Sequence, residues 1–436
     1  MAGESMSGMR YSGPGHGRRA VVLGAGIVGV TAARALQREG FSVTIVDQGE
    51  PGRGCSYGNG GAISPDFCVP IAMPGMLRRV PKWLFDPNGP LVVRWSDLPS
   101  SAPWLMRWIR AGRLDQLDSL SNALRQLHAT SYTRYQQLLG CRATGLIERT
   151  GQLYVWATNA PNATEALANE IRKKFDIETR ALDRDEIREM DANLAPIFSR
   201  GLYFPDNGHT VNPLRLVQTI ADMITSEGGV ILKQRAIRFE FDERRARFLR
   251  CDGDLLEGDI FVVAAGIASK DFAKGLGDEV PLQAERGYHV MLPNPGVWPR
   301  VKVSNRDYMF GMTSMEHGVR IAGTVEIARA DAPIDERRPR AMLKMAKRMY
   351  PKLNDDGAEF WMGCRPSTPD SLPVIDRSRA ATNVIYAFGH GHTGLTGAPM
   401  TAEIVAAFAA DIQPQIDPSP YSLKRFGRSC FARILG

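Results

Sequence analysis

The most constraining feature of this sequence is a glycine pattern that begins at residue 24. Residues 21–23 are apolar and run directly into Gly24-Ala-Gly-Ile-Val-Gly29, and Asp47 follows eighteen residues after the last glycine. The pattern predicts a strand over 21–23, a helix over 31–38 and a second strand over 42–46 that leads into Asp47. In such a unit the first glycine permits a tight turn, the second lets the backbone approach a pyrophosphate, and the third lets helix and strand pack closely. The sequence therefore predicts a bound dinucleotide, and at this point either NAD(P) or FAD would fit.

A glycine-rich loop follows Asp47. Six glycines lie within the thirteen residues 49–61. Glycine reaches positive φ without steric cost and lets the backbone lie close to a ligand. In dinucleotide-binding units with this glycine pattern, the N-terminus of the helix faces the phosphates. The acidic residue after the second strand, here Asp47, accepts hydrogen bonds from the ribose hydroxyls. We therefore expect the loop to lie beside the nucleotide.

Two further apolar segments end at small-residue turns. Residues 259–265 run into Gly266, and residues 383–388 run into Gly389-His-Gly-His-Thr-Gly394. Ligands of open α/β sheets bind at the carboxyl ends of the strands, so three such ends spread along the chain indicate one nucleotide domain assembled from distant segments. That arrangement favours FAD, because the N-terminus of the last helix can face the flavin and stabilise negative charge on the reduced ring. The alternative is that the turns at Gly266 and Gly389 are ordinary connections from strand to helix.

The chain of 436 residues is long enough for two domains. We expect the α/β class in a two-domain (α+β) arrangement, with a Rossmann-like FAD-binding domain and a β-rich substrate or cap domain. The FAD-binding domain is expected over 18–66, 205–285 and 363–436, the cap domain over 67–204 and 286–362, and a disordered tail over 1–17. Helices are predicted over 114–139, 162–175, 213–227, 341–350 and 398–410, and strands over 146–157, 230–241 (hairpinned to 246–251), 288–292, 301–303 and 319–323.

Composition excludes several classes of function. The 54 basic and 47 acidic residues give a net charge of +7 that is spread along the chain, and no basic run is interleaved with aromatics, so no nucleic-acid partner is expected. The six cysteines are widely spaced and form no C-x-x-C pair, which is typical of reduced thiols in a cytosolic chain; no metal site is expected. No apolar run is long enough to cross a bilayer. We therefore expect a cytoplasmic protein.

A segment rich in tryptophan leaves contact with the inner membrane open. It contains Trp83, Trp95, Trp104 and Trp108 together with several arginines. Basic helices that carry tryptophan can lie at a membrane surface, which would suit transfer of electrons to a membrane quinone. The other interpretation is a folded cap whose core contains the tryptophans.

At this point the sequence resembles the FAD-dependent D-amino-acid dehydrogenases of the D-amino-acid oxidase superfamily, including the D-hydroxyproline dehydrogenase branch. The similarity covers residues 18 to about 412 and rests on four motifs in the family's order. They are Gly24-Ala-Gly-Ile-Val-Gly29, Ser56-Tyr-Gly-Asn-Gly-Gly-Ala-Ile-Ser64, Trp361-Met-Gly-Cys-Arg-Pro-Ser-Thr-Pro-Asp370 and Gly389-His-Gly-His-Thr-Gly394. The first motif is generic, whereas the Arg-Pro-Ser-Thr-Pro-Asp segment is specific.

The resemblance implies roles for particular residues. Arg365 would grip the substrate carboxylate, which a guanidinium binds through two parallel hydrogen bonds. Tyr288 and Tyr308 would orient substrate, or else be core tyrosines, and His390 would tune the flavin, orient substrate or cap a helix. Cys364 is interpreted as an inert core thiol. The expected FAD contacts are Gly24, Gly26, Ile27, Val28, Gly29, Asp47, Gln48, Ser56, Asn59, Gly60, Gly61, Ala236, Ala264, Ala265, Gly266, Gly391, Thr393 and Gly394.

The chemistry that the resemblance implies is oxidation of a D-amino or D-imino acid. Hydride would pass from the α-carbon to flavin N5, and water would hydrolyse the imine to a 2-oxo acid. Electrons would then pass to a quinone or another acceptor, and neither a catalytic base nor an oligomeric state is indicated. The alternatives are a dehydrogenase of D-proline or cis-4-hydroxy-D-proline, an oxygen-using oxidase of the glycine or sarcosine type, an NAD-dependent dehydrogenase, and an FAD-binding structural subunit without catalysis.

Overall fold

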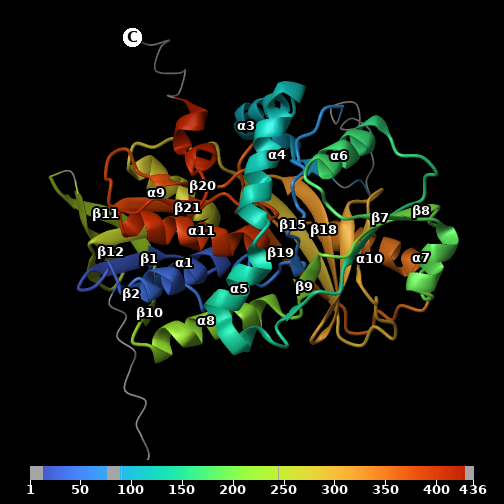
Figure 1. Ribbon diagram of the computed structural model, residues 1–436, viewed down its shortest axis with the longest axis horizontal. Helices are drawn as coiled ribbons and strands as arrows, with labels where there is room; N and C mark the ends of the chain where they lie inside the picture. The colour runs from blue at the N-terminus through green and yellow to red at the C-terminus, as the bar shows by residue number, and fades with distance from the viewer. Residues whose placement is uncertain (1–12, 76–88, 90, 244, 428–436) are drawn as a thin grey trace, which may run out of the picture.

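The computed structural model describes residues 13–75, 89, 91–243 and 245–427, and its two principal sheets lie side by side (Figure 1). The first sheet has six strands in the order β10–β2–β1–β14–β21–β20. Their bounds are β10 (Val230–Lys233), β2 (Ser42–Asp47), β1 (Arg19–Leu23), β14 (Ile260–Val263), β21 (Val384–Phe388) and β20 (Val374–Arg377). All neighbours pair in parallel except β20, which runs antiparallel to β21. The sheet is thus assembled from distant segments, and the expected fold class is confirmed.

Helices cover one face of this sheet. α1 (Ile27–Arg38), α8 (Pro213–Ser226) and α11 (Gly394–Ala409) share a core with alternate residues of β1 and β2. Outside them lie α4 (Leu114–His128) and α5 (Ser131–Leu139), which contact α11. The other face packs against α9 (Ser269–Gly275) and a small antiparallel sheet of β11 (Ala236–Asp242), β12 (Arg245–Cys251) and β13 (Leu255–Glu257).

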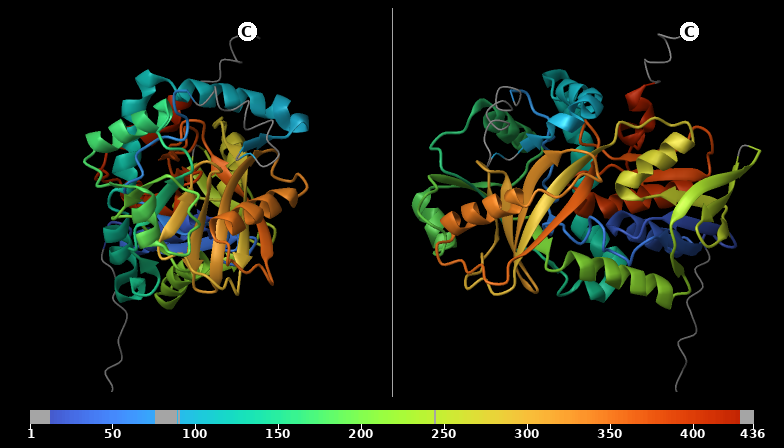
Figure 2. Two further views of the ribbon diagram at one scale, coloured as in Figure 1. Left: turned by 90° about the vertical axis from the view of Figure 1, so that its right-hand side faces the viewer. Right: turned by 180° about the vertical axis from the view of Figure 1, so that it is seen from behind.

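The second principal sheet has nine strands. Eight follow the order β19–β15–β18–β17–β16–β6–β8–β7, and β4 pairs with β18. The bounds are β19 (Glu359–Ser367), β15 (Gln283–Leu292), β18 (Gly318–Ile327), β17 (Phe310–Met315), β16 (Lys302–Asn305), β6 (Gln152–Trp156), β8 (Arg200–Phe204), β7 (Arg180–Leu182) and β4 (Leu91–Val93). α10 (Arg337–Met349) covers its outer face, as the view from behind shows (Figure 2, right).

The remaining elements are short or peripheral. β3 (Ala62–Ile63), β9 (Gly208–Thr210) and β5 (Ile147–Glu148) form a small sheet, and α3 (Leu98–Ala111), α6 (Ala163–Lys174) and α7 (Arg184–Met190) complete the helices of the described residues. Short 3₁₀ segments occupy Trp95–Asp97, Gly140–Ala143, Gly266–Ala268, Ser419–Tyr421 and Leu423–Phe426. Within the described ranges, no helix has the length and apolar character required to span a bilayer.

Several sequence-based expectations for local structure need correction. The single strand over 146–157 is wrong, because β5 pairs with β9 in the small sheet while β6 pairs with β16 and β8 in the nine-stranded sheet. The single strand over 230–241 is wrong, because the chain passes from β10 in the parallel sheet to β11 in a hairpin with β12. α1 begins at Ile27 rather than residue 31, since Gly26 already has the extended conformation of a helix N-cap. Residues 13–17 are not a free tail, because the Gly15 N–H donates a hydrogen bond to the Glu39 carbonyl at 2.8 Å. Residues 1–12 of the expected tail lie outside the described residues.

The domain boundaries stay predictions. One observation opposes the assignment of the whole segment 67–204 to the cap domain. α4 and α5 belong to the segment 67–204 that was assigned to the cap. Their side chains Leu124, Leu127 and Tyr135 are nevertheless buried in the core that α1 and α11 share. This part of the segment therefore packs with the six-stranded sheet.

Candidate active site

One large cavity extends between the six-stranded and the nine-stranded sheets. Its volume is about 1330 Å³, above the roughly 300–1,000 Å³ of common small-molecule sites. The turn between β1 and α1 and Asp47 lie along it, as do Arg365 on β19 and the turn that precedes α11. A cavity of this size can hold a dinucleotide together with a small substrate.

The glycine motif forms the nucleotide part of the cavity as its spacing predicts. Gly24 has a φ of +106°, and a Cβ atom there would lie 2.4 Å from the Ala264 carbonyl oxygen. A Cβ at Gly29 would lie 1.8 Å from the Gly24 carbonyl oxygen, so only glycine allows α1 to pack this closely on β1. Gly26 lines the cavity, and its nearest side-chain atom is the Ser56 hydroxyl oxygen, 3.3 Å from a Cβ placed there. The same hydroxyl accepts a hydrogen bond from the Ile27 N–H at 2.9 Å.

Asp47 joins two loops of the cavity wall. One carboxylate oxygen accepts the Ala25 N–H at 2.8 Å, and the other accepts the Gly49 N–H at 2.9 Å. Each carboxylate oxygen has two lone pairs, so capacity remains for ribose hydroxyls. This acid therefore fixes the glycine turn and the following loop while it faces the cavity.

The structure brings nearly all the expected cofactor residues to the cavity. The exceptions are Gly29, which serves packing, and Gly61, where a Cβ would lie 2.8 Å from the Thr210 carbonyl oxygen. The expected residues that line the cavity are Gly24, Gly26, Ile27, Val28, Asp47, Gln48, Ser56, Asn59, Gly60, Ala236, Ala264, Ala265, Gly266, Gly391, Thr393 and Gly394.

The glycine-rich loop is held by charged residues that the sequence analysis missed. Arg320 donates to the carbonyls of Tyr57 and Asn59 at 2.7 and 2.8 Å. Lys302 donates to the Gly60 carbonyl at 3.2 Å, and burial lowers the pKa of its ammonium to about 8. Arg320 and Lys302 each stand within an otherwise apolar strand pattern. Because a buried charge needs a specific partner, this interruption is the sequence signal that could have identified them.

Arg365 reaches the cavity from β19. Its Nη1 donates to the Thr324 carbonyl at 3.0 Å, and its strand neighbour on β15 is Glu285. Thr324 itself has a φ of +54°, which is rare for a β-branched residue, and lies where the pairing of β15 and β18 shifts register. Burial lowers the pKa of Arg365, although a guanidinium remains protonated in proteins. The charged guanidinium of Arg365 therefore faces the cavity, where its other N–H groups can donate hydrogen bonds to a ligand.

Glu285 is a buried carboxylate beside Arg365. It lines the cavity, and its Oε2 lies 2.7 Å from Nε2 of His392, in the turn before α11. Burial raises the pKa of Glu285, but the interactions with His392 and Arg365 outweigh burial, so the pKa lies below its usual value. No sequence pattern predicted a role for Glu285.

His390 also lines the cavity, as expected. Its Nε2 lies 2.8 Å from the Thr401 hydroxyl inside α11, so its ring does not cap that helix. Burial, reinforced by the neighbouring His128, lowers the pKa of His390 to about 3. The ring is therefore neutral and fixed against α11.

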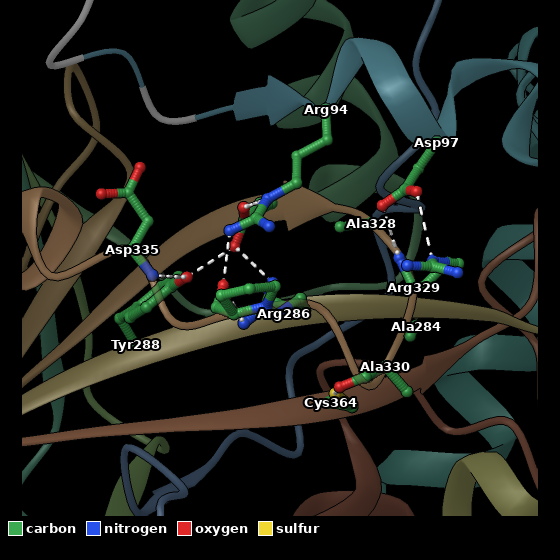
Figure 3. Close-up of polar contacts among 12 residues, drawn as sticks. Arg94, Asp97, Ala284, Arg286, Tyr288, Ala328, Arg329, Ala330, Asp335 and Cys364 are labelled. Atoms are coloured by element: carbon green, nitrogen blue, oxygen red, sulfur yellow. Dashed lines mark hydrogen bonds and ion pairs between the residues drawn. The ribbon is translucent and has the colours of Figure 1, made fainter.

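Neither expected tyrosine lies at the cavity, which corrects both catalytic assignments. Side chains alternate between the two faces of a strand, and Glu285 and Gly287 of β15 take the cavity face. Tyr288 takes the opposite face, where its hydroxyl donates to Glu326 at 2.5 Å (Figure 3). Tyr308 lines a separate small cavity together with Met342 and Met345 of α10. Both residues therefore match the other interpretation, in which they are core tyrosines.

The network around Tyr288 is structural. Glu326 accepts from Arg94 at 2.5 Å and lies 3.4 Å from Nη1 of the fully buried Arg286 (Figure 3). Both arginines also donate to the carbonyl of Pro333, at 2.5 and 3.1 Å. Two cations on one carboxylate therefore fasten the segment that follows β18 to β15, on the face of the sheet away from the cavity.

Aromatic side chains complete the cavity wall. Trp361 stacks on His289 with ring centroids 5.0 Å apart. Trp104 is buried and donates to the Ser367 carbonyl at 3.0 Å, and Trp108 lines the cavity. Cys364 pairs with Arg286 across β19 and β15, so its thiol takes the face away from the cavity, where it donates to the Ala330 carbonyl at 3.7 Å; burial raises its pKa, which keeps it protonated. Trp83 lies outside the described residues.

Comparison with known proteins gives a consistent family. The sequence pattern that defines the FAD dependent oxidoreductase family matches residues 19–408. A D-amino-acid oxidase from Bradyrhizobium diazoefficiens is 35% identical over 418 residues, which cover 94% of this chain and 99% of that protein. An L-proline dehydrogenase structure from P. horikoshii superposes with a TM-score of 0.70 at 18% identity, covering 94% of this chain and 98% of the other. For an iminodiacetate oxidase from Chelativorans sp. BNC1 the TM-score is 0.69 at 20% identity, with coverage of 93% and 98%.

The cavity fits the cofactor that this family uses. A pyrophosphate can approach where Gly26 lacks a side chain, a ribose can lie against Asp47, and the N-terminus of α11 adjoins the same cavity. The predicted dinucleotide is therefore FAD rather than NAD(P). The chain belongs to the FAD-dependent oxidoreductase family.

Proposed function

We propose that the protein oxidises a D-amino or D-imino acid at the α-carbon. The observation that carries the proposal is the position of Arg365, a cationic fork that faces the same cavity as the FAD-binding turns. Such a fork suits a carboxylate, which it binds in one defined orientation. The D-amino-acid oxidase that is 35% identical supports an amino-acid substrate.

The residues of the chain position the substrate, and FAD supplies the chemistry by accepting the α-hydrogen as hydride. Arg365 would hold the carboxylate and so direct the α-carbon toward the cofactor. Trp104, Trp108 and Trp361 line the cavity and present apolar rings that would exclude water from a bound substrate. The amine becomes an imine, and water hydrolyses the imine to a 2-oxo acid.

The test is anaerobic bleaching of the flavin absorbance by a panel of D- and L-amino acids. The panel should include D-alanine, D-proline, cis-4-hydroxy-D-proline, glycine and sarcosine, each with its L-form where one exists. Bleaching by D-forms is the expected result. Bleaching by L-forms or glycine alone would contradict the assignment of stereochemistry, and a yellow protein that no amine bleaches would favour a structural role.

The electron acceptor is tested in the same preparation. Trp95 is 75% exposed and Met106 on α3 is 64% exposed, close to the exposed Arg110. This combination supports a proposal that α3 contacts a membrane surface, where a quinone would take the electrons. Reoxidation of the reduced enzyme should then be faster with a soluble quinone analogue than with air, and vesicles containing anionic lipid should retain the protein. Fast reoxidation by air alone would assign an oxidase.

A further inference from the structure

Glu285 is placed where a zwitterionic substrate would present its amine. It pairs directly with Arg365 across β15 and β19, and both side chains take the cavity face of the sheet. Side chains at directly opposed positions have Cβ atoms about 4.5–5.5 Å apart. A carboxylate held by Arg365 therefore brings the α-amino group of the same molecule within reach of Glu285.

We propose that Glu285 binds the ammonium group of the substrate and that the Glu285–His392 pair takes its proton. The proposal rests on the proposed function and assigns the proton acceptor that this function requires. The ammonium N–H bond breaks, its electron pair stays on nitrogen, and the proton passes to Glu285 and from there through His392 to solvent. The neutral amine that results can donate its electron pair as the α-hydrogen leaves.

His392 gives the proton a route out of the cavity. Its Nε2 lies 2.7 Å from Glu285 Oε2, and its side chain is 31% exposed, whereas the Glu285 side chain is 7% exposed. The pair therefore connects a buried proton acceptor to solvent through one imidazole.

Binding of the substrate itself would prepare Glu285 for this role. The charged and titratable groups that face Glu285 are His392 and Arg365, and Arg365 in turn adjoins Cys55. Both neighbours lower the pKa of Glu285. When a substrate carboxylate neutralises Arg365, one of these effects is removed, so the affinity of Glu285 for a proton rises as the ammonium arrives.

The competing explanation is that Glu285 only balances the charge of Arg365. The two roles predict different results for Glu285→Gln. A counter-ion competes with every carboxylate ligand, so its removal would strengthen the binding of all of them. An ammonium acceptor contributes to binding only when the ligand carries an amine, so its removal would weaken amino-acid binding alone.

The experiment compares D-proline with tetrahydrofuran-2-carboxylate, in which a ring oxygen replaces the amine. Binding to the dithionite-reduced holoenzyme is measured anaerobically by calorimetry, because the reduced enzyme cannot turn D-proline over. Glu285→Gln should weaken D-proline binding by about tenfold or more, and leave the oxygen analogue unchanged or tighter. Repeating the titration in buffers with different ionisation enthalpies counts protons; wild type should release close to one proton with D-proline, and the variant none.

Two variants complete the test. His392→Gln should retain D-proline binding better than Glu285→Gln but reduce proton release, and Glu359→Gln, an exposed acid on β19, should match wild type. D-proline binding that Glu285→Gln leaves intact, or that strengthens in parallel with the oxygen analogue, would overturn the inference. A wild-type enzyme that binds neither ligand and is bleached by no amino acid would overturn the proposed function itself.

Discussion

The guanidinium of Arg365 lies directly over Gly287 of the neighbouring strand. A Cβ atom at residue 287 would lie 2.2 Å from Arg365 Cζ, which no side chain can accommodate without displacing the arginine. Gly287→Ala should therefore shift Arg365 away from the cavity and raise KM about tenfold or more, while FAD binding is retained. Steady-state kinetics together with the flavin absorbance ratio measure both effects, and an unchanged KM would show that Arg365 has room to adjust.

Arg365→Ala should leave the flavin bound and raise KM by about 100-fold, because a charge-assisted bidentate contact to the carboxylate is lost. Arg365→Lys restores the charge without the fork geometry and should recover only part of the affinity. Kinetics with the best D-substrate provide the measurement. Near-normal KM in the alanine variant would remove Arg365 from the binding site.

Gly26→Val should give a colourless protein. Its side chain would point at the Ser56 hydroxyl and into the cavity where the pyrophosphate approaches. Gly275→Val, at an exposed helical position with no atom within 4 Å of the added Cβ, is the matched control and should remain yellow. Retained flavin absorbance in the Gly26 variant would contradict the assigned position of the phosphates.

Stability should fall as pH drops below about 6.5, the pKa of histidine in an unfolded chain. Burial lowers the pKa of His128 and His209 to about 4 and that of His289 and His390 to about 3. Between these values and 6.5 the unfolded chain binds more protons than the folded one, so stability is complete above 6.5 and declines toward pH 4. Each histidine contributes a slope of up to about 1.4 kcal/mol per pH unit.

The measurement is urea unfolding between pH 4.5 and 7.5. His128→Gln should make the pH dependence shallower by about the contribution of one proton, although its stability at pH 7.5 is lower because the contact with the Phe67 carbonyl changes. The same slope in wild type and variant would show that folding leaves the proton affinity of His128 unchanged.

The nucleotide half of the site was predictable because its determinants are local. The roles of Gly24 and Gly29 depend on residues close in sequence or in the adjacent strand, and their spacing identifies the turn. The substrate half was not predictable in the same way. Tyr288 and Glu285 are only three residues apart on one strand, yet opposite faces separate them, and only the pairing with β18 and β19 shows which face meets the cavity.

The same limit explains the errors in the fold. Residues 230–241 have one continuous strand pattern, but β10 pairs with β2 while β11 pairs with β12, and both partners are chosen by tertiary contacts. Buried cations such as Lys302 and Arg320 were visible as interruptions of apolar strands. Their partners are backbone carbonyls of the glycine-rich loop, which no local pattern identifies.

The distant origin of the strands has a consequence for biosynthesis. β1 begins at Arg19, but β21 begins only at Val384 and α11, which adjoins the same cavity, ends at Ala409. A ribosome must therefore complete the chain through α11 before the cofactor pocket can close, since domains form as their segments emerge. FAD would be captured at or after release of the chain. A polypeptide truncated before residue 384 would lack β21 and α11 and would not retain FAD.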